Sequence, residues 1–185
     1  MEERAVVKRA PRYPVALSVA GRRCMVIGGG GVATRKVLSL VESGAAVHVV
    51  SPALSERLTG LADAGRIGVE RRPYQPGDLR GAFLAIAATD DRAVNAAVAA
   101  EARAERVLLT VCDDPDASDI TGMATLRRGA MTVAVSTDGA SPTLARLVSE
   151  ALAEFLTPEY AVLLELMATE RQSAQRRRPI TGARR

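Results

Sequence analysis

An α/β fold built on a Rossmann-like parallel sheet is predicted by two features of the sequence. Short apolar runs alternate with helical segments from Met25 to Cys112, which is the pattern of a parallel sheet covered by helices on both faces. Four glycines, Gly28–Gly31, follow the first apolar run and open a helical segment. After residue 113 the alternation ends, and the pattern predicts a small β-hairpin region followed by C-terminal helices.

Five strands are expected in the first part of the chain, with helices between them. Gly44 ends the first helix in the position where a left-handed residue is favoured. The expected strands are 23–27, 46–50, 66–71, 83–88 and 107–112, and the expected helices are 32–41, 53–64 and 92–106.

The second part of the chain is predicted to be a hairpin and two helices. The hairpin strands are expected at 120–126 and 131–136, and Ser141-Pro142 has the N-cap and first-turn residues of a helix that runs to about residue 155. Pro158 begins another helix. At roughly 60 residues this part is too small to bury its own core, so it packs on the first part or on a copy of itself.

The net charge of +4 comes from one end of the chain. Six arginines and no acid lie in residues 171–185, so the rest of the chain is slightly acidic. Such a tail is typical of a solvated, disordered end, with an arm that binds phosphates or carboxylates as the alternative. Because aromatic residues make up 3% of the chain, we expect no nucleic-acid partner.

Membrane, secreted and metal-dependent classes are not expected. No apolar run reaches about 18 residues, and the N-terminus lacks the apolar region of a signal peptide, so a cytoplasmic location and no membrane partner are predicted. One histidine and two cysteines cannot form a four-ligand zinc site. We expect His48 to face a covering helix, and Cys24 and Cys112 to lie in buried strands.

The glycine run matches the dinucleotide-binding pattern G-x-G-x-x-A. Gly28 allows the tight turn, Gly30 lets the backbone approach a pyrophosphate, and Ala33 allows close packing of helix on strand. The run follows an expected strand and opens an expected helix, which is the context that the pattern requires. A glycine turn without a ligand is the alternative.

The end of the second strand departs from an ordinary NAD site. It carries Ser51-Pro52 where an acidic residue usually holds the ribose hydroxyls. We expect the ribose to be held by backbone groups or by Ser51. NAD is favoured over NADP as the cofactor.

Acidic residues follow the fourth and fifth strands, at the edge where α/β sheets bind ligands. Thr89 and Asp90 are expected to face the cofactor, although helix capping explains the Asp90-Asp91 pair equally. Asp113 is the best candidate for a general base, with a turn-forming aspartate as its alternative. The hydroxyl-rich loop of Ser136 and Thr137 precedes a helix N-terminus, where a substrate carboxylate can bind; a capped turn is the other interpretation.

Six segments of the sequence carry a family resemblance. The chain resembles the precorrin-2 dehydrogenase / sirohydrochlorin ferrochelatase family, the NAD-dependent module of sirohaem synthesis. The matching segments are Tyr13-Pro14-Val15, VIGGGGVATRKV (26–37), VVSPAL (49–54), AIAATDDRAVN (85–95), TVCDDP (110–115) and MTVAVSTDGASPTLARLV (131–148).

The resemblance implies an activity and a division of the chain. The family oxidises precorrin-2 to sirohydrochlorin with NAD⁺. It implies a Rossmann-like domain at 13–113, a dimerisation region at 114–157 and a helical segment with the Arg-rich tail at 158–185, and it implies a homodimer. The position of Asp113 corresponds to the family's catalytic aspartate. The family's dinucleotide contacts correspond to Gly30, Gly31, Val32, Pro52 and Ala53.

Two other functions stay open at this point. Some family members also insert Fe²⁺ into sirohydrochlorin, but the helical C-terminal part of this chain is short for that role. A non-catalytic dinucleotide-binding sensor or tetrapyrrole carrier is the other alternative. Since the substrate that the resemblance implies bears many carboxylates, Arg127, Arg128 and Arg146 are candidates for holding it.

Overall fold

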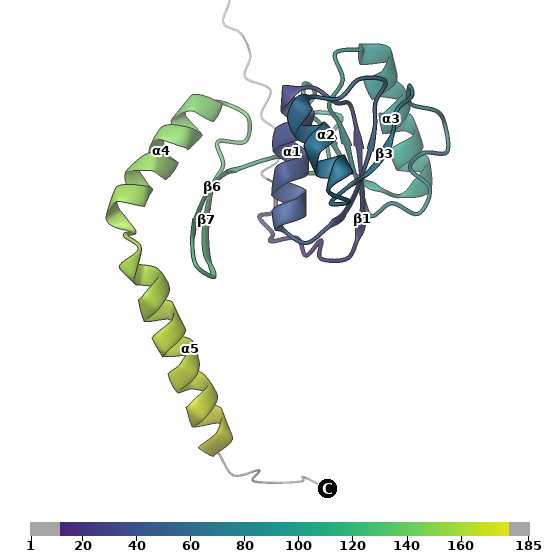
Figure 1. The fold of residues 1–185 in the computed structure, drawn as a ribbon. Coiled ribbons are helices and arrows are strands. Elements are labelled where there is room, and N and C mark those ends of the chain that lie inside the picture. Colours follow the sequence, from purple (N-terminus) through teal and green to yellow (C-terminus); the bar gives the residue numbers. More distant parts are fainter. Residues whose placement is uncertain (1–11, 178–185) are drawn as a thin grey trace, which may run out of the picture. The chain divides into compact units, whose positions relative to one another are not determined.

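The computed structural model describes residues 12–177. The chain forms two compact units, Met1–Thr121 and Gly122–Arg185 (Figure 1). A parallel sheet with three helices makes up the first unit, and a hairpin with two helices makes up the second.

The sheet of the first unit has five parallel strands in the order β3-β2-β1-β4-β5. The chain order reverses between β1 and β4, and in such sheets ligands bind beside the carboxyl ends of the strands at this reversal. The predicted fold class is confirmed. The strands are β1 (Arg23–Ile27), β2 (Ala46–Val50), β3 (Gly68–Glu70), β4 (Leu84–Ala87) and β5 (Leu108–Val111).

Helices cover both faces of this sheet. Helices α1 (Gly31–Glu42) and α2 (Glu56–Asp63) lie on one face and α3 (Arg92–Glu105) on the other (Figure 1). Val26 of β1 packs in the core with α1 and α2, whereas its neighbour Ile27 packs in the core with α3. Because both faces are buried in the middle of the sheet, β4 and residues 24–27 of β1 are continuously apolar rather than alternating.

Residues 118–120 close the outer edge of β5. Ser118 Oγ accepts the Val111 N–H at 2.8 Å, and Asp119 Oδ2 accepts the Leu109 N–H at 3.1 Å. The Asp119 and Ile120 N–H groups in turn donate to the Leu109 carbonyl. These bonds satisfy backbone groups that an edge strand otherwise presents to water or to another chain.

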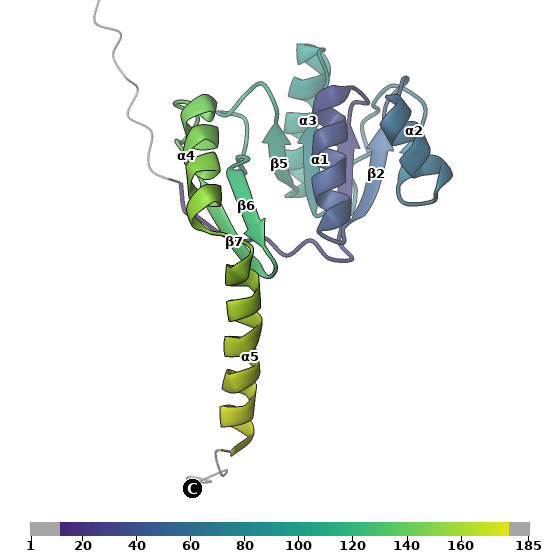
Figure 2. The same cartoon turned by 60° about the vertical axis from the view of Figure 1, so that its left-hand side comes forward.

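The second unit begins with an antiparallel hairpin, β6 (Ala124–Arg128) and β7 (Met131–Val135). Helix α4 (Pro142–Phe155) packs against both strands (Figure 2), and it begins as predicted, with the Ser141 hydroxyl accepting from the Leu144 N–H and Pro142 in the first turn. Helix α5 (Glu159–Arg177) follows.

Two sequence expectations about single residues are wrong. Cys112 comes just after β5 and is exposed, whereas Cys24 is buried as expected. His48 is also exposed, because α3 packs on β4 and β5 and does not cover this position of β2. The His48 ring lies beside Gly68 of β3, where an added Cβ would come within 2.6 Å of it.

The sequence predicts a disordered tail for the Arg-rich segment 171–185, and this expectation is wrong for its first residues. Helix α5 continues to Arg177, so the first residues of this segment are helical. Residues 178–185 lie outside the described part of the chain.

Candidate functional site

The first two glycines of the turn between β1 and α1 are required by close backbone packing. Gly28 has φ of +123°, and a Cβ on it would lie 2.3 Å from the Ala88 carbonyl oxygen. A Cβ on Gly29 would lie 1.9 Å from the Ala53 carbonyl oxygen. Any side chain at these two positions collides with backbone, so the turn lies directly on the segments that follow β2 and β4.

The last two glycines of the turn face open space. A Cβ on Gly30 or Gly31 would meet no atom within 4 Å. Gly30 is the N-cap of α1 and supplies no side-chain cap, and the first turn of the helix holds no acidic residue. The free N–H groups and the positive end of the helix dipole therefore suit a phosphate group, and the space in front of them suits the pyrophosphate of a dinucleotide.

A cavity of about 760 Å³ lies in front of this turn, within the size range of small-molecule sites. It brings together every residue that the sequence analysis assigns to cofactor binding: Gly28, Gly30, Gly31, Val32, Ser51, Pro52, Ala53, Thr89 and Asp90. Asp113 lines the same cavity. Their role in binding stays a prediction, but their common location is a property of the structure.

The turn after β2 is held by the serine that the sequence analysis assigns to the ribose. Ser51 is 6% exposed, and its hydroxyl donates to the Ala53 carbonyl at 2.7 Å. With its proton used there, the hydroxyl can only accept a bond from a ribose. The backbone of this turn is the other source of polar contacts.

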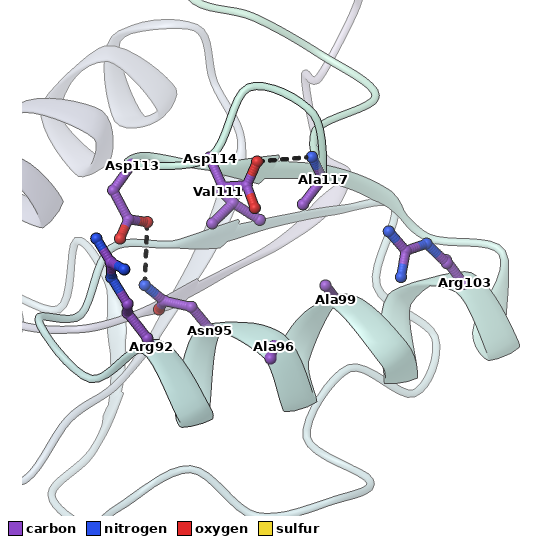
Figure 3. A pocket seen from close by; sticks show the side chains of 9 residues that line it. All are labelled: Arg92, Asn95, Ala96, Ala99, Arg103, Val111, Asp113, Asp114 and Ala117. Atoms are coloured by element: carbon purple, nitrogen blue, oxygen red, sulfur yellow. Dashed lines mark hydrogen bonds between the residues drawn. The ribbon is translucent and has the colours of Figure 1, made fainter.

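Asp113 is held by a short network of side chains. Asn95, which is 4% exposed, donates from Nδ2 to the Thr89 carbonyl at 3.0 Å and to Asp113 Oδ1 at 3.2 Å (Figure 3). The Thr89 hydroxyl donates to Asn95 Oδ1 at 2.7 Å, which fixes the orientation of the amide. The network orients one oxygen of Asp113 and leaves the exposed carboxylate at the cavity wall.

The two acidic residues after β4, Asp90 and Asp91, have different roles. Asp91 caps α3 by accepting from the N–H groups of Ala93 and Val94 at 2.8 and 3.2 Å, which is the capping alternative foreseen for this pair. Asp90 lines the cavity.

The loop after β3 contributes Pro73 and Tyr74 to the cavity, and neither residue is among the predicted site residues. Glu101 of α3 anchors this loop: its carboxylate accepts from the Tyr74 hydroxyl and, through Oε1, from the Gly77 N–H at 2.9 Å and the Leu79 N–H at 3.0 Å. Burial, together with the carboxylate of Glu101, raises the pKa of Tyr74, so the phenol stays protonated as a donor. No local pattern identifies a partner 27 residues away.

The residues assigned to the substrate lie in the second unit and have local partners. Ser136 Oγ and Thr137 Oγ1 each accept a backbone N–H at 3.1 Å, so they form the capped turn of the alternative interpretation. Arg146 pairs with Glu150 at 3.5 Å on the surface of α4. Arg128 donates to the carbonyls of Ala153 and Leu156 at the end of α4, which commits its guanidinium to the fold.

No group of three histidine, cysteine, aspartate or glutamate side chains within residues 12–177 is arranged to hold a metal ion. In the same part of the chain, none of the helices combines the length and the apolar character that crossing a bilayer requires.

Two relatives are similar over almost the whole chain. The siroheme synthase of Chromobacterium violaceum is 38% identical over 173 residues, which are 94% of this chain and 37% of the relative. The siroheme synthase of Nitrosococcus oceani is 39% identical over 171 residues, which are 92% of this chain and 36% of the relative. The chain thus spans little more than a third of the length of these relatives.

A solved structure has a similar fold and a similar length. The structure of SirC, precorrin-2 dehydrogenase, matches with a TM-score of 0.76 and 29% sequence identity, covering 93% of this chain and 84% of that chain.

Two family models match consecutive parts of the chain. The model described as "Sirohaem biosynthesis protein central" matches residues 128–153. The model described as "Putative NAD(P)-binding" matches residues 15–124. Since the latter extends over more than half of the chain and includes every residue of the glycine-lined cavity, the chain belongs to this NAD(P)-binding family.

Proposed function

We propose that the chain is a precorrin-2 dehydrogenase, which oxidises precorrin-2 to sirohydrochlorin with NAD⁺. The observation that carries the proposal is Asp113, a carboxylate held by Asn95 on the wall of the glycine-lined cavity. The similarity to SirC over 84% of that chain supports the same reaction, as does the similarity to siroheme synthases.

The residues of the chain divide the work of this oxidation. The N-terminus of α1 and the bare backbone at Gly30 and Gly31 hold the pyrophosphate of the cofactor. The nicotinamide, when bound, supplies the acceptor for the hydride that leaves precorrin-2. The accompanying proton goes to the Asp113 carboxylate, which requires an oxygen of Asp113 within about 3 Å of the acidic position. Asn95 keeps that oxygen in place.

We assign NAD rather than NADP as the cofactor on the charges near β2. The turn Ser51–Ala53 carries no basic side chain, whereas NADP sites commonly hold the additional phosphate with an arginine. Arg72, which follows the neighbouring strand β3, is bound by Glu70 and Asp78. Those two carboxylates offset its charge.

The second unit contributes a further proposed contact to the substrate. Ser136 and Thr137 accept backbone hydrogen bonds at 3.1 Å but keep their own protons, and with Arg146 they form the proposed second-unit contact to a substrate carboxylate.

A second copy of the chain is the proposed protein partner, because α4 and α5 carry exposed large apolar side chains. A cytoplasmic location agrees with the free thiols of Cys24 and Cys112.

The decisive test is anaerobic oxidation of precorrin-2 by the purified chain, followed through the absorbance of NADH and of the product. Asp113→Asn should lower kcat by about 100-fold or more, because it removes the proton acceptor and keeps the shape of the side chain. The dissociation constant of NAD⁺ should not change.

Asp63→Asn is the matched control, because Asp63 is an exposed aspartate at the end of α2. Equal turnover of Asp113→Asn and wild type would remove Asp113 from the mechanism. Binding of NAD⁺ by the wild type without any oxidation of precorrin-2 would contradict the enzyme and favour a sensor or carrier.

A further inference from the structure

A second cavity is also lined by Asp113. It has a volume of about 450 Å³ and lies between α3 and the segment that leaves β5 (Figure 3). Among the described residues, Asp113 is the one that lines both this cavity and the glycine-lined one. A group bound in the second cavity would therefore lie next to the proposed base.

The cavity is lined mainly by polar and charged side chains, with small apolar side chains between them and an arginine at each end. Ala96 and Ala99 of α3 form one wall, and Val111 and Ala117 lie opposite. Arg92 and Arg103 lie at the two ends of the α3 wall (Figure 3). They are eleven residues apart, which is three helical turns and about 16 Å of rise, so both project from the same side of α3.

Neither arginine is committed to another part of the fold. The structure records no ion pair or side-chain hydrogen bond of Arg92 or Arg103 with any residue of the described range. The acidic lining residues, by contrast, have donors. Asp114 Oδ1 accepts from the N–H groups of Asp116 and Ala117 at 2.9 and 3.1 Å, and Asp113 accepts from Asn95. Of the four charged lining residues, the two arginines are thus the ones whose side chains make no hydrogen bond or ion pair within the described range.

We propose that this second cavity is the carboxylate-binding subsite for the substrate. Arg92 and Arg103 bind carboxylates on the rim of a flat, largely apolar molecule, and the alanine wall contacts its edge. The rim carboxylates of a tetrapyrrole have this chemistry, because they are spread around a planar apolar body. Guanidinium groups suit them because each can donate two parallel hydrogen bonds to one carboxylate. The inference rests on the proposed function and names the residues that select its substrate class.

The test separates substrate binding from turnover. Arg92→Gln and Arg103→Gln should each raise KM for precorrin-2 by about tenfold and leave kcat nearly unchanged, because a contact to the rim is equally strong in the ground and transition states. The dissociation constant of NAD⁺ should not change. Arg57→Gln removes the same charge from an exposed position of α2, on the opposite face of the sheet, and should leave KM unchanged.

A second variant tests the wall rather than the charge. Ala96 is exposed on α3, so Ala96→Leu fills the cavity without disturbing the core, and it should raise KM while the melting temperature stays the same. If neither arginine variant raises KM beyond the Arg57→Gln control, or if they lower kcat alone, the subsite is excluded.

A direct measurement of porphyrin binding tests the subsite separately from the oxidation of precorrin-2. The fluorescence of an octacarboxylate porphyrin is titrated with the wild type and with each variant, which needs no turnover. If the wild type oxidises no precorrin-2, the proposed function fails. The subsite is still supported where porphyrin binding weakens in Arg92→Gln and Arg103→Gln but not in Arg57→Gln. Equal binding by all variants, or no binding by the wild type, overturns it.

Discussion

In the turn between β1 and α1, the neighbouring residues Gly29 and Gly30 lack a side chain for different reasons. At Gly29 the fold itself leaves no room, since the Ala53 carbonyl lies 1.9 Å from the place of a Cβ. At Gly30 the fold leaves open space, and in the proposed function this space is filled by the cofactor. The two positions therefore separate a requirement of folding from a requirement of binding.

Alanine substitutions should show this separation. Gly29→Ala should lower the free energy of unfolding by about 1–3 kcal/mol, because backbone must move to admit the methyl group. Gly30→Ala should fold with unchanged stability but weaken NAD⁺ binding about tenfold or more, which corresponds to about 1.4 kcal/mol. Urea unfolding and calorimetric titration with NAD⁺ measure the two quantities. Equal loss of stability in both variants would contradict this account of the turn.

Single residues were predictable where their partners are near in sequence. The glycine pattern spans the six residues 28–33 and leads directly into α1, and its glycines lie at the glycine-lined cavity. Asn95 carries no such signal, because its contact with Asp113 spans 18 residues and depends on β4 and β5 being neighbours. Arg92 and Arg103 were missed for a similar reason, since a helix face gives no sign of the cavity beside it.

At the scale of elements, the loop after β3 owes its shape to charged contacts. Arg72 donates to both oxygens of Asp78, and Asp78 Oδ2 also accepts from the Gln75 N–H at 2.8 Å. These contacts, the Arg72 hydrogen bonds above all, hold the pKa of Asp78 below its usual value. The loop that carries Tyr74 to the cavity is thus stabilised by an ionised carboxylate.

The stability of the protein should consequently fall in acid. The folded-state pKa of Asp78 lies below the ordinary aspartate value of 3.8. Its contribution is therefore complete above that value and disappears as the pH drops through the folded pKa. Asp78→Asn should lower the free energy of unfolding at pH 7 by about 1–3 kcal/mol and should flatten its decline below about pH 4. Urea unfolding from pH 7 to well below pH 4, with Asp63→Asn as control, measures both effects. A parallel decline in Asp78→Asn and wild type would refute this role.

Helices and strands were more predictable than loops. Capping residues such as Ser141 and Asp91 act within their own first turn, so the helix starts could be located. The run 66–71 yields only the three residues of β3, because the pairing with β2 ends at Glu70. The place of the Tyr74 loop at the cavity depends on Glu101 in a later helix, so no local pattern indicates it.

At the scale of the whole molecule, the second unit leaves an apolar stripe uncovered. The stripe on α4 follows helical spacing, and its large members are between 39% and 70% exposed: Leu144, Leu147, Val148 and Phe155. Neighbouring α5 adds Val162, Leu163, Leu166 and Met167, also exposed. Stripes of this kind mark association surfaces.

A homodimer should form through this stripe. Light scattering after gel filtration should give twice the 19.5 kDa of one chain. Leu144→Glu should shift the mass to that of the monomer, because a carboxylate in an apolar interface loses its hydration. Thr143→Glu places the same charge one residue earlier, on the polar side of α4, and should stay dimeric. A monomeric wild type would contradict the proposal.

The hydrogen bonds that residues 118–120 make with β5 also determine where the first unit can be truncated without exposing an edge strand. At one side of the sheet β3 is too short to recruit a further strand. At the other side the backbone of β5 is already occupied by Ser118 and Asp119. A fragment of the first unit that ends before Ser118 would expose β5 as an edge strand with unpaired backbone groups and should tend to aggregate. A fragment that extends to Ile120 keeps the residues that satisfy those groups.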